Sequence, residues 1–414
     1  MKNKIVLIGI GPFPSGHTTE MGFAHIRFWS LYHTLTSAGY SVHCSAVPAS
    51  VDHNLEIDIP SDTLAVVTAG SFAPAQAALQ IPRDIPLWLD WPSDPLADLH
   101  AKIQAPNAIV SDQDIAYTQS LRESAILRAD AIGVISMRQY WVTLSQLLAY
   151  DIGDQHLQQR IHYTPIAYHF PHPSSPPQSK TIQRLAICGS ANTWLDDQQM
   201  KEEIDHALNV HEQLEIHIFG GGVQNHYLAG GERIAAWRHP RIHHHGWLPQ
   251  SDFLKEIQNC QAGFWIDRPG VEPLLGSRTR AMFFSWMGMD IFGSCQTELM
   301  QDLEREQLVS PMLGPGDLAR AITAAEHLRK QPKLQDYCRA LYAPSEVYAP
   351  LLHWLKNPTK RPPARQDLRG QELLEMKSQM QRIYASPTWR VTNRAHQAIK
   401  KLWKYIPSAD KQGD

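Results

Sequence analysis

Short apolar runs, each followed by a segment with helical spacing of its apolar residues, recur along this chain. Residues 5–10 form a nearly continuous apolar run, which is typical of a strand buried on both faces. A helix is expected from about Thr18 to a stop at Gly39, because apolar residues recur every three or four positions, at Met21, Ala24, Phe28, Leu31 and Leu35. Strands that alternate with helices predict a parallel sheet with right-handed crossover connections.

The alternation occurs in two series, separated by a segment rich in Pro, Ser and His at residues 164–180. The first series has predicted strands at residues 5–10, 40–46, 64–68, 86–90, 108–110 and 131–136. The second has predicted strands at residues 184–188, 214–219, 241–244, 263–266 and 290–292, and helices at 197–209 and 252–258, the latter capped by Ser251. The sequence therefore predicts an α/β protein with two parallel-sheet domains, and chemistry is expected in the cleft between them.

Length and composition agree with a globular enzyme of more than one domain. The chain has 414 residues, of which 43% are hydrophobic and 19% are charged, and domains usually contain about 100–200 residues. No apolar run approaches the ~20 residues that a membrane-spanning helix requires, and the first residues favour a strand over a signal peptide. The five cysteines are scattered without a Cys-x-x-Cys pair, which favours reduced thiols and a cytoplasmic location.

Charge is divided unevenly along the chain. Residues 359–414 contain 12 Lys and Arg against 5 Asp and Glu, a net charge of +7, so residues 1–358 carry −10 of the total of −3. The acidic body argues against nucleic-acid binding. A predicted helix at residues 391–406 mixes apolar with basic residues: Ala395, Ile399, Leu402 and Trp403 with Arg394, Lys400, Lys401 and Lys404. This pattern predicts binding to an anionic membrane surface, with packing on the protein itself or on a partner as the alternative.

Residues 263–294 contain the side chains best suited to an anionic ligand. A predicted strand ends at Asp267, a loop carries Glu272, and Arg278 and Arg280 precede a helix. Ligands of open α/β sheets bind at the carboxyl ends of strands, and both guanidinium groups and helix starts suit phosphate oxygens. The stretch predicts a pocket for a phosphorylated ligand, favouring a nucleotide. The alternative is that the two arginines pair only with surface carboxylates.

Two loops of the first series follow predicted strands. Gly9 and Gly11 begin like a dinucleotide-binding fingerprint, but Pro14 stands in place of the third glycine, so a nicotinamide dehydrogenase is not expected. This loop lets a ligand approach the backbone closely or forms a plain tight turn. Asp90 and Asp94 follow a later strand, and Asp94 is predicted to cap the next helix.

Three consecutive histidines, His243 to His245, raise the question of a metal site. Neighbouring residues of a strand point to opposite faces, and no cysteine or carboxylate pattern accompanies these histidines in the sequence. A metal site is therefore not expected here.

Several short motifs occur in a characteristic order between Lys4 and Ala340. They are GPFPSG at 11–16, DWPSDP at 90–95, SMRQYW at 136–141, FGGG at 219–222, GWLP at 246–249, and Glu272 with Arg278-Thr279-Arg280 and Gly288. This order resembles that of the GT-B glycosyltransferases, in particular glycosyltransferase family 4 and a bacterial surface-polysaccharide and lipopolysaccharide subgroup. The resemblance implies two Rossmann-like domains facing a cleft, with the boundaries 1–170 (acceptor domain), 171–183 (linker), 184–340 (nucleotide-sugar domain), 341–358 (returning helix) and 359–414 (basic helical tail).

The resemblance also implies roles for individual residues. Arg278 and Arg280 are expected to neutralise the donor diphosphate, and Glu272 to contact the donor sugar or support its developing positive charge. The other implied site residues are Gly189, Ser190, Gly220, Gly221 and Gly222 on the donor side, Gly16 and His17 approaching the donor from the first domain, and Asp90 and Asp94 on the acceptor side. Such enzymes usually retain the anomeric configuration and usually need no metal, so no cofactor is expected.

The chain departs from the family pattern in its donor site. The glutamate that normally contacts the ribose, five residues before the helix-ending Gly288, is replaced by Phe283, and the position of its usual partner is Leu275 rather than Glu272. Glu298 is taken as a substitute. The resulting hypothesis is a cytoplasmic glycosyltransferase, acting on a glycan or lipid-linked acceptor in bacterial surface-glycan assembly, at the inner face of the membrane if the tail binds there. The alternatives are a non-catalytic nucleotide-sugar-binding or scaffold protein and, more weakly, a GT-B epimerase or phosphorylase-like enzyme.

Overall fold

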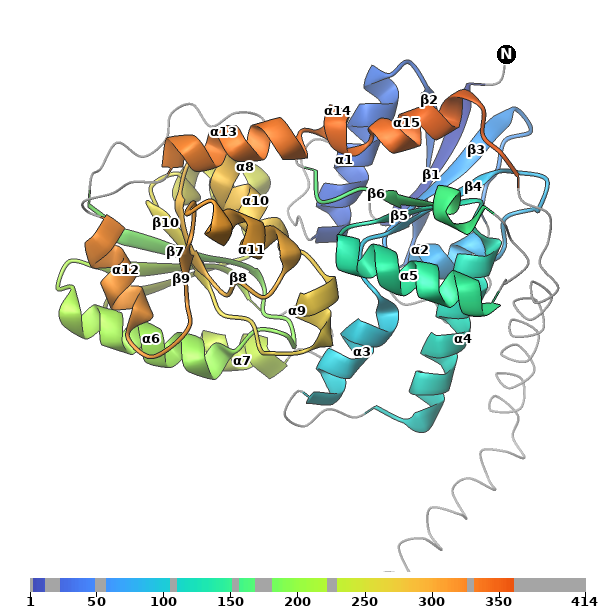
Figure 1. The fold of residues 1–414 in the computed structure, drawn as a ribbon. Helices are drawn as coiled ribbons and strands as arrows, with labels where there is room; N and C mark the ends of the chain where they lie inside the picture. The colour runs from blue at the N-terminus through green and yellow to red at the C-terminus, as the bar shows by residue number, and fades with distance from the viewer. Residues whose placement is uncertain are drawn as a thin grey trace, which may run out of the picture. The chain divides into compact units, whose positions relative to one another are not determined.

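Two parallel β-sheets, each of six strands and flanked by helices, form the framework (Figure 1). The structure is a computed structural model, and it describes residues 3–11, 23–48, 57–104, 110–150, 156–167, 181–221, 229–325 and 331–360. The basic tail predicted at 359–414 therefore lies almost wholly outside the described residues. Among the described helices, none is long and apolar enough to cross a membrane.

The first sheet has the strand order β2-β1-β3-β4-β5-β6. Its strands are β1 (Lys4–Ile10), β2 (Ser41–Val47), β3 (Thr63–Ala69), β4 (Leu87–Trp91), β5 (Ala131–Val134) and β6 (Ile161–Tyr163). Along β1, Ile5 and Leu7 belong to one apolar cluster, and Val6 and Ile8 belong to the other. Both faces of the strand are thus covered, which explains why its sequence is continuously apolar.

The first sheet is accompanied by the helices α1 (Phe23–Ser37), α2 (Phe72–Ala78), α3 (Pro95–Gln104), α4 (Asp112–Arg128), α5 (Met137–Tyr150) and the 3₁₀ helix η1 (Leu157–Arg160). The capping role predicted for Asp94 is confirmed at the start of α3. The backbone N–H of Leu96 donates to Asp94 Oδ1 over 2.9 Å, and this bond satisfies a donor that the first helical turn leaves without a partner.

The second sheet has the strand order β12-β11-β10-β7-β8-β9. Its strands are β7 (Arg184–Ser190), β8 (Glu215–Gly221), β9 (Ile242–Gly246), β10 (Ala262–Trp265), β11 (Asp290–Gly293) and β12 (Ser310–Pro311). The helices of this half are α6 (Asp197–Val210), α7 (Ala229–Ala235), α8 (Gln250–Ile257), α9 (Val271–Leu275), α10 (Thr279–Trp286), α11 (Glu298–Arg305) and α12 (Asp317–Ala325). The short helix α9 lies in the loop between β10 and α10.

The strands predicted from the sequence agree with β1–β5 and β7–β11 to within two residues. The strand predicted at 108–110 is not supported, because Val110 is outside any strand and residues 108 and 109 are outside the described ones. Strands β6 and β12 were not predicted, since runs of three and two residues are too short to show a period. The cap predicted at Ser251 is wrong: α8 begins at Gln250, its N-cap residue is Pro249, and no side chain caps its start.

The chain returns to the first sheet after completing the second. The helices α13 (Gln331–Tyr342), α14 (Pro344–Val347) and α15 (Ala349–Lys356) run from the second sheet to the first in Figure 1. Tyr348 is buried with the Arg27 guanidinium 5.4 Å from its ring centre, and the Trp354 ring lies 5.6 Å from that of Trp88 on β4. Residues from the end of the described chain therefore complete the core around the first sheet.

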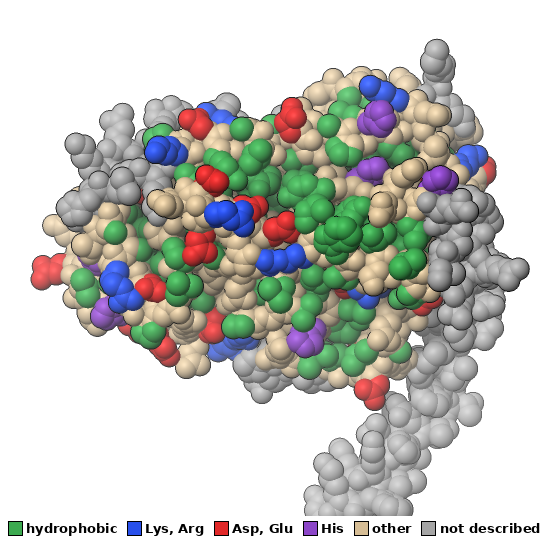
Figure 2. All heavy atoms as spheres, in the orientation of Figure 1, with side chains coloured by type: hydrophobic (Ala, Val, Ile, Leu, Met, Phe, Trp, Pro, Cys, Tyr) green, Lys and Arg blue, Asp and Glu red, His purple; other side chains and the backbone are tan. Residues whose placement is uncertain are grey.

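Surface charges of both signs lie next to each other on the face shown in Figure 2, where the coloured Lys and Arg side chains stand among Asp and Glu side chains. On this face the described residues form no broad basic area of the kind that nucleic-acid binding requires.

Candidate functional site

A cavity of about 290 Å³ lies at the carboxyl ends of strands of the second sheet and has a wall from the first half of the chain. The second half contributes Gly189 and Ser190 from the end of β7, Gly220 from the end of β8, and the residues from Gly276 to Arg280. The first half contributes Ile26, Pro92, Ser93 and Asp98. This is the edge at which open α/β sheets bind ligands.

Two glycines bring the ends of β7 and β8 together at the cavity. Gly189 and Gly220 both have positive φ, +94° and +90°, in the region that disfavours other residues. A Cβ added at Gly220 would stand 2.7 Å from the carbonyl oxygen of Gly189. Both glycines line the cavity, so at these two positions a ligand meets backbone without a side chain.

Arg278 is held by two buried carboxylates. Its Nε donates to Asp267 Oδ2 over 2.9 Å, and its Nη1 and Nη2 donate to the two oxygens of Glu272 over 3.0 and 2.8 Å. All three side chains are buried. Burial by itself lowers the pKa of Arg278, but Asp267 and Glu272 outweigh this effect and raise the pKa above its ordinary value. The guanidinium is thus largely occupied in fixing α9 and the loop before α10.

Arg280 has a different environment, although it follows Arg278 by only two residues. It lines the cavity near the start of α10, and its Nη1 is covered without a hydrogen-bond partner among the described residues. Burial lowers the pKa of Arg280 from its ordinary value, with Asp267 acting in the opposite direction. Helix α10 begins after Arg278 with no side-chain cap, so the first N–H groups of the helix add partial positive charge beside Arg280.

Asp98 of α3 is a cavity residue that the sequence analysis did not identify. It accepts a hydrogen bond from Ser93 Oγ over 3.0 Å. Burial and, after it, the negative charge of Glu272 raise the pKa of Asp98 to about 7. No motif marked this residue, because Asp98 reaches the cavity only through the packing of α3 against α9.

The two carboxylates predicted on the acceptor side, Asp90 and Asp94, are not among the residues that line the cavity. Asp90 is fully buried, and its carboxylate accepts hydrogen bonds from Arg27 Nε and Nη2 over 2.8 and 2.6 Å. Asp94 caps α3 and pairs with Arg122 Nη2 over 2.5 Å. Both therefore hold the first half together behind the cavity wall to which Asp98 belongs.

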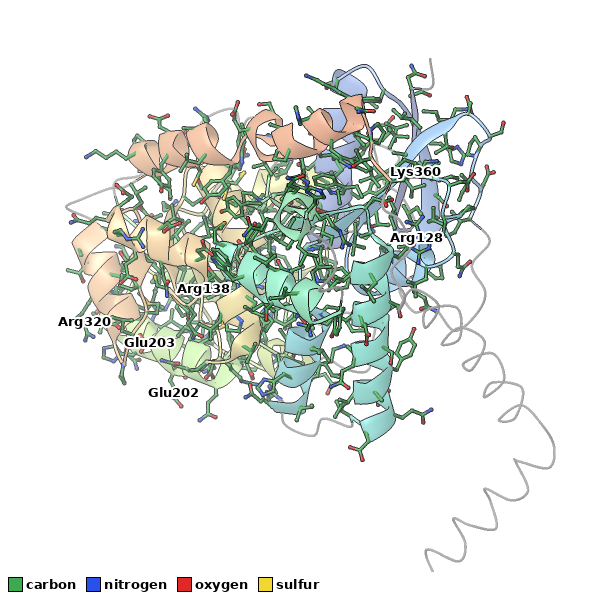
Figure 3. The ribbon with its side chains drawn as sticks, turned by 45° about the vertical axis from the view of Figure 1, so that its right-hand side comes forward. Arg128, Arg138, Glu202, Glu203, Arg320 and Lys360 are labelled. Atoms are coloured by element: carbon green, nitrogen blue, oxygen red, sulfur yellow. The ribbon has the colours of Figure 1, made fainter. Side chains whose placement is uncertain are left out.

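Glu298 also lies away from the cavity lining. Its Oε2 accepts from the backbone N–H of Arg138 at the start of α5 over 3.2 Å. Arg138 in turn donates to the carbonyl of Gln296 over 2.9 Å and to the side chain of Gln301; Figure 3 shows its place on the structure. These contacts join α5 of the first half to the segment around α11. Glu298 thus contacts the backbone of α5, and it does not line the cavity in which a ribose contact was expected of it.

Phe283 lines the cavity at the position where the family pattern has a glutamate. Its ring stacks on that of Phe253 from α8, with centroids 5.3 Å apart and an angle of 24° between the planes. Phe253 in turn meets Phe219 edge-on. This side of the cavity is therefore aromatic and apolar rather than acidic.

The structure brings together Glu272, Arg278, Arg280, Gly189, Ser190 and Gly220 of the predicted site around one cavity. Gly221 follows Gly220 at the end of β8 and is not part of the lining. Gly16, His17 and Gly222 lie outside the described residues, so their predicted roles stay predictions.

The interpretation that no carboxylate accompanies the histidines of residues 243–245 is wrong in three dimensions. Strand alternation is observed: His243 and His245 share one face of β9, and His244 faces away, with its Nε2 3.0 Å from the carbonyl of Trp237. The neighbouring strand β8, however, places Glu215 and His217 beside His243. A single sequence does not show this arrangement, because parallel pairing places His217 opposite His243, which is 26 positions away.

Two parallel six-stranded sheets, with a cavity lined from both halves of the chain, are the arrangement of the GT-B fold. Solved structures similar to this chain include sucrose-phosphate synthase from Thermosynechococcus elongatus (TM-score 0.58, 13% identity, covering 86% of this chain and 98% of that one). HepE of Anabaena in complex with UDP-glucose is also similar, with a TM-score of 0.53, 11% identity, and coverage of 85% of this chain and 99% of that one. The glycosyltransferase AviGT4 of avilamycin A biosynthesis has a TM-score of 0.51 and 12% identity, and the match covers 86% of this chain and 99% of that one. At these identities the likeness establishes the fold alone.

Sequence comparisons add no closer relative. No protein-family model matches the chain, and no curated protein matches its sequence.

Proposed function

We propose that this protein is a glycosyltransferase that takes its sugar from a nucleoside-diphosphate sugar. The observation that carries the proposal is Arg280, a cavity-lining cation whose Nη1 is covered and has no hydrogen-bond partner among the described residues. A buried donor without a partner costs free energy. A small rotation of the guanidinium turns Nη1 toward a phosphate oxygen placed in the cavity beside the uncapped start of α10, and this contact removes that cost.

The same groups supply the chemistry of sugar transfer. When the bond between the sugar and the diphosphate breaks, negative charge grows on the leaving diphosphate. Arg280 and the first N–H groups of α10 are fixed before the reaction, so they stabilise this charge without reorganisation. Gly189, where an added Cβ would meet nothing within 4 Å, leaves room for the diphosphate against the backbone.

Glu272 is proposed to hold the donor sugar. An ionised carboxylate has about four lone-pair positions, and Arg278 uses one on each oxygen. Glu272 lines the cavity, so its remaining lone pairs are available to accept from sugar hydroxyls. In this proposal Arg278 acts as a positioning residue, since it fixes Glu272.

The acceptor is proposed to lie against the first half of the chain, with Asp98 accepting a hydrogen bond from its hydroxyl group. Asp98 comes from the first half and lines the same cavity as Glu272, whose negative charge helps to raise the pKa of Asp98. The resemblance to family 4 supports a retaining mechanism and a glycan or lipid-linked acceptor in bacterial surface-glycan assembly.

A second candidate function is favoured by Phe283. An aromatic ring cannot accept the ribose hydrogen bonds that the glutamate of the family pattern accepts, and Phe283 is stacked on Phe253. A chain that binds a nucleotide-sugar on this aromatic surface without transferring the sugar would fit the same cavity.

Calorimetric titration of the full chain with UDP-, GDP- and CDP-sugars, followed by assay of nucleoside diphosphate release, tests the proposal. Binding of one nucleotide class, with release of its diphosphate in the presence of an acceptor extract, is expected. Binding without release in any acceptor fraction would favour the non-catalytic candidate. Failure of all three classes to bind would contradict both.

A further inference from the structure

Three metal-binding side chains meet on one face of the second sheet, outside the cavity lining. Glu215 and His217 are two residues apart on β8, so they point to the same face. His243 of the edge strand β9 stands directly opposite His217 in the strand register. One ligand atom from each of the three side chains lies within 4.8 Å of the other two.

The separations of these atoms fit a small divalent ion. His217 Nε2 is 3.4 Å from Glu215 Oε2, and His243 Nε2 is 3.9 Å from Glu215 Oε1. Zinc binds imidazole nitrogen and carboxylate oxygen at about 2.0–2.2 Å, and corners of a tetrahedron of that size are about 3.3–3.6 Å apart. Small rotations of the side chains therefore bring all three atoms to bonding distance.

His243 Nε2 supplies an independent observation. The atom is covered by protein, and it has no hydrogen-bond partner among the described residues. A covered polar atom without a partner is costly unless something binds it. The atom lies 3.9 Å from Glu215 Oε1, within reach of an ion that Glu215 and His217 would share.

His245 supports His217 from the next position on the same face of β9. His217 Nδ1 lies 3.0 Å from His245 Nε2, and the two rings stack at 5.2 Å. When His217 carries its proton on Nδ1 and donates it to His245, its Nε2 presents a lone pair toward Glu215 and His243. Metal-binding histidines are typically fixed by such a bond from their second nitrogen.

We propose that Glu215, His217 and His243 bind a divalent transition metal ion, for which Zn²⁺ is the best-fitting candidate, with water as the fourth ligand. Two imidazoles and one carboxylate suit zinc and its neighbours in the first transition row, whereas Mg²⁺ and Ca²⁺ prefer oxygen ligands. The ion joins β8 to the edge strand β9. Phe219 and Gly246, which line the cavity, follow on these same two strands, so the metal stabilises one wall of the cavity without entering it.

The test uses the full chain, freed of metal by a chelator and then titrated with Zn²⁺ against a competing indicator. One Zn²⁺ per chain is expected to bind, with a rise in Tm because the ion binds the folded chain. Co²⁺ in the same site is expected to give the visible absorption of tetrahedral coordination. The chain has 21 histidines, so stoichiometry separates a built site from scattered surface binding.

Variants locate the site. Glu215→Gln, His217→Ala and His243→Ala are each expected to abolish this one-to-one binding, and His245→Ala to weaken it by about 10- to 100-fold. His244→Ala is the matched control, since it removes a histidine from the opposite face of β9 and should bind Zn²⁺ as the wild type does. If a variant fails to fold, the Co²⁺ spectrum of the wild type still decides the question. Absence of tetrahedral Co²⁺ absorption in the wild type, or unchanged Zn²⁺ affinity in a folded His217→Ala variant, would overturn the proposal.

Discussion

Glu272 and Arg278 form a buried two-bond ion pair, in which Nη1 donates to Oε1 over 3.0 Å and Nη2 to Oε2 over 2.8 Å. With Asp267 on its Nε, the Arg278 charge is matched within the protein. Arg280 differs, because its Nη1 has no hydrogen-bond partner among the described groups. Two arginines in one tripeptide are thus predicted to differ in role: Arg278 maintains the structure of the loop, and Arg280 meets the ligand.

Arg280→Ala is expected to weaken nucleotide-sugar binding by about 10- to 150-fold. The reason is the loss of a charge-assisted hydrogen bond worth about 1.5–3 kcal/mol. Calorimetric titration with whichever nucleotide-sugar binds the wild type measures the change. Arg320→Ala is the control, since Arg320 lies on α12 and is largely exposed (Figure 3). Wild-type affinity in Arg280→Ala would remove Arg280 from the binding site.

Arg278→Ala is expected to act chiefly on stability. The substitution leaves Asp267 and Glu272 buried without their cation, and removal of one partner from a buried ion pair costs about 3–5 kcal/mol. Chemical denaturation measures the free energy of unfolding. The Arg280→Ala variant serves as comparison, and a loss no larger in Arg278→Ala than in Arg280→Ala would contradict the assignment of different roles.

Asp98→Asn is expected to raise the KM for the acceptor by about 10- to 150-fold, since a hydrogen bond to a charged group is lost. The pKa of Asp98 is raised to about 7 by burial and by Glu272, so the carboxyl group is protonated below pH 7 and ionised above it. The acceptor KM of the wild type should therefore fall as pH rises through about 7. This dependence should disappear in Asp98→Asn and persist in Asp205→Asn, a change on the exposed side of α6. A pH profile that Asp98→Asn leaves intact would rule out this role.

Sugar transfer is expected to continue in EDTA. Arg280 and the start of α10 offset phosphate charge where other enzymes use a divalent ion, and the cavity-lining carboxylate Glu272 is already bonded to Arg278. The measurement is the rate of nucleoside diphosphate release before and after chelation. At the separate site on β8 and β9, chelation should remove zinc and thereby lower the Tm of the protein. Complete loss of transfer, restored by Mn²⁺, would show that these positive groups do not suffice.

The tail is predicted to bind anionic membrane. Each Lys or Arg near such a surface contributes about 1 kcal/mol, so changing Lys400, Lys401 and Lys404 together to Glu should abolish co-sedimentation of the full chain with anionic vesicles. Neutral vesicles are the control. Salt dependence alone does not discriminate, because docking of the basic tail on the acidic body would also weaken with salt. Failure of the wild type to sediment with anionic vesicles would point to another role for the tail.

The fold was predictable from the sequence because parallel strands that are buried on both faces consist of continuous apolar runs, as in β1 and β7. The donor side of the site was predictable for a related reason: Gly189, Glu272 and Arg280 follow strands directly, and strand ends meet at one edge of a sheet. Asp98 was not predictable, since its place in the cavity depends on how helices α3 and α9 pack. The proximity of Glu215 to His243 was not predictable either, because the register between strands is not visible in a single sequence.

The return of α14 and α15 to the first sheet has a consequence for the order in which the molecule is completed. Tyr348 and Trp354 cover Arg27 and Trp88, yet they leave the ribosome after the whole second sheet. Domains generally fold in the order of their synthesis. We therefore expect the half that is synthesised first to be completed last, because Arg27 and Trp88 gain these contacts only after Tyr348 and Trp354 have been synthesised.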